Sequence, residues 1–193
     1  ETDITDGDTF IMFYSGHGTH DGTNTTEYIV PSDANPANLG TMISDEELNN
    51  WINQYMPSYA KKIFIFDSCN SGGMFKSLAA LPKGFTWSTG FDVMARNIAG
   101  PCKIVMTACD KGEVSWETSG YPANGHGVFT WALTEGMRYP YPADADVPQK
   151  NHAVDTNEAF YYASFYTTKH FPEQNPQIYR GESRSEWWYL FTY

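Results

Sequence analysis

Three short apolar segments recur along the chain, at residues 10–14, 63–66 and 104–106. None of them alternates apolar with polar residues, which is typical of strands buried on both faces of a parallel sheet. The first two run directly into polar, glycine-containing loops with the sequences YSGHG and DSCNSGG. The pattern therefore predicts a buried parallel sheet whose first two strands end in loops of unusual composition.

Helical periodicity lies between the first two apolar segments. Ser44 and Glu47 have the spacing of a helix-capping pair, and apolar residues then recur at positions 48, 51, 52, 55 and 56. Pro57 ends this pattern. A strand, a helix and a second parallel strand form a crossover unit, so we expect an α/β fold in which helices flank a mostly parallel sheet.

The rest of the chain adds two helices and two loops to this prediction. Helices are expected at Val128–Met137 and at residues 155–168, the second with another capping pair at its start. Residues 139–148 are rich in proline and predict a surface loop, while residues 70–101 carry five glycines and predict a long connection that could serve as a processing linker. Without internal repeats, residues 1–193 are expected to form one domain.

Composition narrows the class of protein. The 193 residues are 41% hydrophobic without a membrane-spanning apolar run, so we expect a soluble chain with a substantial core and no membrane span. A formal net charge of -11 repels phosphate backbones and argues against nucleic acid as a partner. Three cysteines do not make a disulfide framework, and nothing in the sequence indicates the compartment.

The chemically reactive residues follow the ends of the first two predicted strands. His17 stands between two glycines, and Cys69 stands two residues after Asp67. If these strands are parallel neighbours, both side chains emerge at the same edge of the sheet. A nearby imidazole accepts the thiol proton or lowers the thiol pKa below its free value of about 8.5, which makes cysteine a nucleophile. The backbone N–H groups of Gly18 and Cys69 are then candidates for stabilising an oxyanion.

The two loops resemble the histidine and cysteine boxes of the caspase-like peptidases, most closely those of metacaspases and prokaryotic caspase homologues, in the clan that also contains legumain and gingipain. The similarity continues through KIVMTACDKGEVSWE and GHGVFTWALTEGM to NPQIY. About 50 residues separate the histidine and the cysteine, as in caspases. The resemblance implies a caspase-haemoglobinase fold and a cysteine endopeptidase with a His17–Cys69 dyad.

The resemblance also carries expectations about the precursor. Caspase-like folds place two strands and a helix before the histidine strand, and only residues 1–9 precede it here. A missing N-terminal segment of the same precursor is therefore expected to supply them. Lys76, Lys83 and Arg96 lie in the long connection, which suggests a zymogen that cuts itself there.

The substrate expected from the family is a polypeptide with a basic residue before the cut. In metacaspases, the residues at the positions of Ser15 and Asp67 line the pocket for that side chain, and Asp110 matches a further acid that would form a second wall. A carboxylate facing a guanidinium is strong when the two are paired.

A second segment also points to a basic substrate. Ser115, Trp116 and Glu117 resemble the caspase strand that holds the substrate in extended form. True caspases, which cut after aspartate, have an arginine at the end of this segment, where this chain has Glu117. An acid there opposes an acidic substrate and favours cleavage after Arg or Lys.

The chemistry of the dyad requires no cofactor, although metacaspases are often activated by calcium. Asp33, Asp45 and Glu46 match part of the pattern of acids that bind it, whereas Lys76 stands near the place of a further acid. Acids at the start of a helix are also favoured by its dipole, so the last two have a structural explanation as well.

Three other interpretations agree with the residues. The chain could be a non-catalytic caspase-like module that binds or scaffolds partners, although such modules usually lose the cysteine or histidine. His17, His20 and Asp21 could bind zinc, for which no further strong ligand is placed. Asp67 could cap a turn.

Cys102 and Cys109 are expected to be buried small apolar residues. A substrate role is expected for Trp116 rather than for Trp131, which lies on the apolar face of a predicted helix.

Overall fold

The computed structural model describes residues 3–21, 25–35, 37–68, 86–87, 92–145, 150–181 and 188–192. Its centre is a four-stranded sheet in the order β1 (Thr9–Gly16), β5 (Lys61–Ser68), β7 (Lys103–Thr107) and β11 (Gln177–Arg180). The first three strands are parallel, and β11 runs antiparallel to β7. The predicted α/β fold with a mostly parallel sheet is confirmed.

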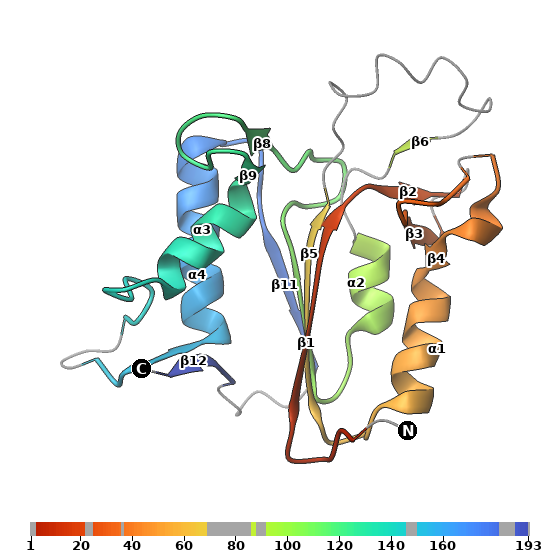
Figure 1. Cartoon of the computed structure of the whole chain (residues 1–193), viewed down its shortest axis with the longest axis horizontal. Coiled ribbons are helices and arrows are strands. Elements are labelled where there is room, and N and C mark those ends of the chain that lie inside the picture. The colour runs from red at the N-terminus through yellow and green to blue at the C-terminus, as the bar shows by residue number, and fades with distance from the viewer. Residues whose placement is uncertain are drawn as a thin grey trace.

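Helices cover both faces of this sheet (Figure 1). The helices α1 (Asp45–Tyr55) and α2 (Asp92–Ile98) lie on one face, and α3 (Val128–Met137) and α4 (Thr156–His170) lie on the other. A hydrophobic core lies on each face of the sheet, and alternate residues of β5 pack in one or the other. This follows because successive side chains of a strand point to opposite faces. Phe64 packs in the core beneath α1 and α2, whereas Ile63 packs in the core beneath α3 and α4. No described helix is long and apolar enough to cross a membrane.

The remaining elements are short. They form a second sheet in the order β4-β3-β2-β6 and two antiparallel pairs, β8 with β9 and β10 with β12. Their bounds are β2 Gly18–His20, β3 Glu27–Ile29, β4 Ile43–Ser44, β6 Thr86–Trp87, β8 Glu117–Thr118, β9 His126–Gly127, β10 Ala153–Asp155 and β12 Tyr189–Thr192, with a 3₁₀ turn at Leu39–Thr41.

The predicted helix starts are present as hydrogen bonds. Ser44 Oγ accepts the N–H of Glu47 at 3.1 Å at the start of α1. At the start of α4, Asp155 accepts the N–H of Glu158, and the Glu158 carboxylate accepts the N–H of Asp155, both at 3.0 Å. Both caps satisfy N–H groups that have no partner within the helix.

Two features differ from the sequence-based expectation. The side chains of Ile11 and Phe13 are 48% and 49% exposed, so β1 is not buried on both faces. The core beneath α3 and α4 takes its strand residues from β5, β7, β10, β11 and β12 and none from β1. The other face of β1 does pack beneath α1 and α2, through Phe10 and Met12. Helix α2, which the sequence analysis did not predict, lies within the long connection of residues 70–101.

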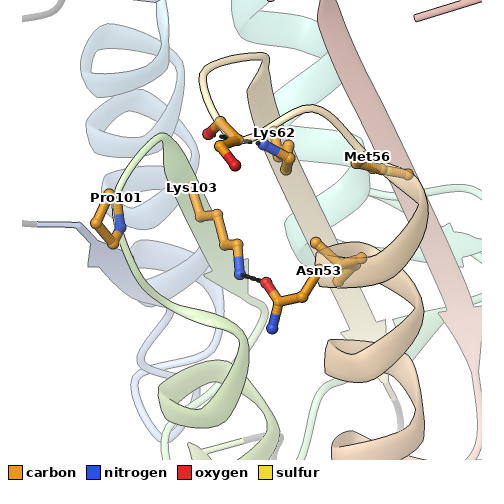
Figure 2. A pocket seen from close by; sticks show the side chains of 7 residues that line it. Asn53, Met56, Lys62, Pro101 and Lys103 are labelled. Carbon is orange, nitrogen blue, oxygen red and sulfur yellow. Dashed lines mark hydrogen bonds between the residues drawn. The ribbon is translucent and has the colours of Figure 1, made fainter.

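A pocket at the N-terminal ends of β5 and β7, opposite the edge where β1 ends, contains two lysines (Figure 2). Lys62 Nζ donates to the carbonyl oxygens of Pro57 at 2.6 Å and Ala60 at 2.7 Å, and Lys103 Nζ donates to Asn53 Oδ1 at 2.9 Å. Burial lowers the pKa of both lysines, and the charge of Lys62 lowers the pKa of Lys103 further. Lys62 thus holds the turn between α1 and β5, and Lys103 joins the start of β7 to α1.

Candidate active site

The paired strands β1 and β5 bring the residue before His17 and the residue before Cys69 to one edge. Their parallel register matches Ser15 with Asp67 and Gly16 with Ser68. His17 follows this ladder directly and is half-buried. Cys69 is the next residue after Ser68 and lies outside the described residues, so its geometry with His17 stays a prediction.

The backbone of His17 is held by the strand that precedes it. Tyr14 Oη donates to the His17 carbonyl at 2.6 Å and to the Val30 carbonyl at 3.2 Å, and the Val30 N–H also donates to the His17 carbonyl at 3.1 Å. A Cβ on Gly16 would lie 2.7 Å from Tyr14 Oη, so a side chain there would displace this phenol. Burial raises the pKa of Tyr14 to about 12. Gly18, a predicted oxyanion donor, is buried at the start of β2.

Asp67 is only 2% exposed and accepts three hydrogen bonds. Ser115 Oγ donates to Oδ1 at 2.6 Å, the Thr130 N–H donates to Oδ2 at 3.0 Å, and Thr130 Oγ1 donates to Oδ2 as well. Helix α3 begins after Gly127, which has no side chain to cap it. The carboxylate from β5 therefore takes the place of the missing N-cap, where a negative charge is also favoured by the helix dipole.

Gly127 permits this arrangement. A Cβ at this position would collide with both carboxylate oxygens of Asp67. Because overlap with a fully packed and hydrogen-bonded group cannot be relieved by a flexible side-chain end, any larger residue must move β9 away from β5.

The other predicted substrate-binding residues lie around this edge. Ser15 is exposed in β1, and Asp110 is half-buried in the turn after β7, where its Oδ1 accepts the N–H of Lys111 at 2.7 Å. Trp116 precedes β8, is 39% exposed and stacks on Phe171 with ring centroids 5.8 Å apart. Glu117, the first residue of β8, is exposed.

The predicted calcium ligands do not come together as a metal site within the described residues. Asp45 is 1% exposed, and its carboxylate accepts the N–H of Glu27 at 3.2 Å and the side-chain amide of Asn97. Asp33 and Glu46 are exposed. In the described part of the chain, no group of three His, Cys, Asp or Glu side chains lies close enough together to hold a metal ion. His17 and His20 are therefore not part of such a group either. These described residues thus do not fit a calcium or zinc site.

Of the two remaining cysteines, Cys109 is buried, as predicted, and Cys102 is only half-buried, in a turn with a φ of 56°. Trp131 is partly buried against the core beneath α3 and α4, which agrees with the structural role expected for it.

Three residues at this edge were not singled out from the sequence. Thr130 binds Asp67, Gln174 binds the segment that contains Trp116, and Glu113 binds Asn175. Their partners lie 58 to 63 residues away in sequence. Glu113 and Thr130 lie within the similar stretches KIVMTACDKGEVSWE and GHGVFTWALTEGM, whereas Gln174 lies just before NPQIY and had no signal of its own.

Comparison with known proteins adds two findings to this geometry. The family model for the caspase domain matches residues 1–185. Metacaspase-7 of Arabidopsis thaliana is 37% identical over 76 residues, and the aligned region covers 35% of this chain and 17% of that protein. The chain thus matches a minor part of the length of this relative.

Proposed function

The chain belongs to the caspase domain family, and from this premise we propose that it is a cysteine endopeptidase that cleaves polypeptides after Arg or Lys with His17 and Cys69 as its dyad. The observation that supports this most is the register of β1 and β5. Because Gly16 pairs with Ser68 in a parallel ladder, the histidine and the cysteine each follow one of two matched positions at the same edge. Active sites of open α/β sheets lie at this edge.

The reaction proceeds in two stages. His17 takes the thiol proton, and Cys69 Sγ forms a bond to the scissile carbonyl carbon, which gives a tetrahedral oxyanion that the N–H groups of Gly18 and Cys69 stabilise. The C–N bond then breaks as His17 gives its proton to the leaving amine, which leaves a thioester. Water, deprotonated by His17, hydrolyses the thioester and releases the acid and the free cysteine.

The preference for a basic side chain is supported by charge. All donors to Asp67 among the described residues are neutral, namely the hydroxyls of Ser115 and Thr130 and one backbone N–H. No positively charged side chain among the described residues therefore offsets this buried carboxylate, and a guanidinium or ammonium group of the substrate would be strongly attracted to it. Asp110 and Glu117 add negative charge at the same edge.

Self-processing is a further part of the proposal that rests on the sequence, and stimulation by calcium would need ligands other than a cluster of the described Asp33, Asp45 and Glu46. Lys76 and Lys83 lie outside the described residues and are the expected sites of self-cleavage. Arg96 lies within helix α2, which would have to unwind before the extended backbone needed for cleavage could form. No step of the proposed reaction passes through calcium.

The test is the release of a fluorophore from matched peptides that end in Arg, Lys or Asp, with and without calcium, by the full-length protein. Cys69→Ala is the blank. Release after Arg or Lys that disappears in this variant is expected, and release after Asp would contradict the assigned pocket. No release, together with equal alkylation rates for Cys69, Cys102 and Cys109, would favour the non-catalytic binding module.

A further inference from the structure

A buried glutamine from the turn after α4 binds the segment that leads into β8. Gln174 is fully buried. Its Oε1 accepts the N–H of Trp116 at 3.0 Å, and its Nε2 donates to the carbonyl of Ala108 at 2.9 Å and to Ser115 Oγ at 3.4 Å. One side chain therefore joins the end of β7 to the residues before β8, and all of its hydrogen-bonding groups are used within the protein.

The neighbouring residues form a second attachment between the same two segments. The N–H and the side-chain amide of Asn175 donate to the Glu113 carboxylate at 2.7 Å and 2.6 Å, and this carboxylate also accepts the N–H of Asp110 at 3.1 Å. Phe171 stacks on the Trp116 ring from the same turn. Residues 171–175 thus fix residues 110–116 at both ends.

The hydrogen bonds of Trp116 also determine which backbone groups face outward. Its carbonyl accepts the N–H of Val128 at 2.8 Å, and its N–H is taken by Gln174. Backbone groups of successive residues in a strand point to opposite edges. The backbone of Glu117 is therefore directed away from β9 toward the edge at which an extended peptide could add as a further strand.

The same glutamine also contacts the buried acid of the site through one hydroxyl. Ser115 Oγ accepts from Gln174 Nε2 and donates to Asp67 Oδ1. We infer that Gln174 is a positioning residue that sets the strand which pairs with an extended peptide substrate, whereas the Asp67 carboxylate is also held directly by the two donors of Thr130. This inference rests on the proposed peptidase function and adds to it the residue that places the substrate backbone.

The test compares Gln174→Met with Gln177→Met in the full-length protein. Methionine keeps the length of glutamine and removes its hydrogen bonds. Gln177 is the control, because among the described residues its side chain donates only to the nearby carbonyl of Asn175. Three quantities are measured for each variant: hydrogen exchange of the Trp116 amide, the rate of Cys69 alkylation by iodoacetamide, and kcat/KM for a tetrapeptide amide and for a single-residue arginine amide.

Gln174→Met is expected to accelerate exchange of the Trp116 amide and to lower kcat/KM for the tetrapeptide about 10- to 100-fold, because a misplaced strand loses the extended substrate. The single-residue amide and the alkylation rate should change less than about threefold, since neither uses the strand. Gln174→Glu, which keeps the acceptor for the Trp116 N–H, should recover part of the slow exchange. Gln177→Met should match the wild type throughout.

Equal losses on the two substrates, unchanged exchange, or accelerated exchange with unchanged tetrapeptide kinetics would each overturn the positioning role. A wild type that cleaves no peptide would overturn the proposed function and the positioning role with it. The exchange result would then show only that Gln174 holds the Trp116 backbone, so the two failures are distinguishable. If Gln174→Met does not fold, Gln174→Glu, which loses the donors to Ala108 and Ser115, is expected to show the same pattern of changes at a smaller size.

Discussion

Ser15 and Asp67 lie opposite each other in the parallel ladder between β1 and β5. This pairing fixes the offset between the two strands. His17 follows two residues after Ser15 in the sequence, and Cys69 follows two residues after Asp67.

Replacing His17 by alanine is expected to lower kcat/KM by about 10² to 10⁴-fold, the usual contribution of a general base. His20→Ala is the matched control, because this second histidine lies in β2 with its Nδ1 against the carbonyl of Asp21 at 2.6 Å. Peptide hydrolysis by the two variants makes the comparison. Equal losses would favour a role that both histidines share, such as binding a metal, and elemental analysis would then be decisive.

Gly127→Ala is expected to destabilise the fold by about 1–3 kcal/mol, because the new methyl group overlaps the Asp67 carboxylate. Gly120→Ala tests the same chemical change in open space, since a Cβ there meets no atom within 4 Å. Urea denaturation of both variants gives the free energy of unfolding. Equal stability of the two would mean that β9 and β5 can separate at little cost.

Thr130→Val keeps the shape of the side chain and removes a hydroxyl donor to Asp67. A hydrogen bond to a charged group contributes about 1.5–3 kcal/mol, so a loss of that size in the free energy of unfolding is expected. Thr134→Val, one turn along α3, removes a hydroxyl that bonds only to carbonyls of its own helix at 3.0 Å and 2.9 Å. This control should change stability by less than about 0.5 kcal/mol.

Ionisation of Tyr14 should make the protein less stable at alkaline pH. Its pKa is raised from 10.0 to about 12 in the folded state by burial, so the folded state keeps a proton that the unfolded state loses. The contribution of Tyr14 to the free energy of unfolding is therefore fully present below pH 10 and is lost between pH 10 and 12. Tyr162, whose pKa is also raised to about 12, chiefly by burial, acts in the same direction.

The check is the pH dependence of the unfolding free energy for Tyr14→Phe. The variant should lose about 1 kcal/mol at pH 8, from the missing hydrogen bond to His17, and should show a shallower decline from pH 10 to 12 than the wild type. Tyr59→Phe, at a position 73% exposed, should follow the wild-type curve. A decline in Tyr14→Phe as steep as in the wild type would contradict this account.

Features encoded by neighbouring residues could be predicted from the sequence. The cap of α4 is an example, because Asp155 and Glu158 need only their own spacing to satisfy one another. The apolar runs of β5 and β7 likewise reflect two covered faces. The strand β1 has a similar run, and yet Ile11 and Phe13 are exposed, because burial depends on which helices pack nearby and not on the strand itself.

Features that depend on distant partners could not be predicted from the local pattern. Asp67 was interpreted from its place before Cys69, but its donors Ser115 and Thr130 lie 48 and 63 residues further on. Nothing near Gln174 in the sequence indicates that it reaches Ala108. Contacts of this kind are determined by the topology of the whole sheet, which a spacing rule does not contain.

The attachment formed by Gln174 has a consequence for biosynthesis. Its contacts with Ala108 and Trp116 span 66 and 58 residues, so they form only after nearly the whole domain has been made. A nascent chain that ends before residue 174 already contains both His17 and Cys69 but lacks the side chain that holds the Trp116 backbone. The proposed peptidase would therefore gain the support for its substrate-binding strand late in synthesis.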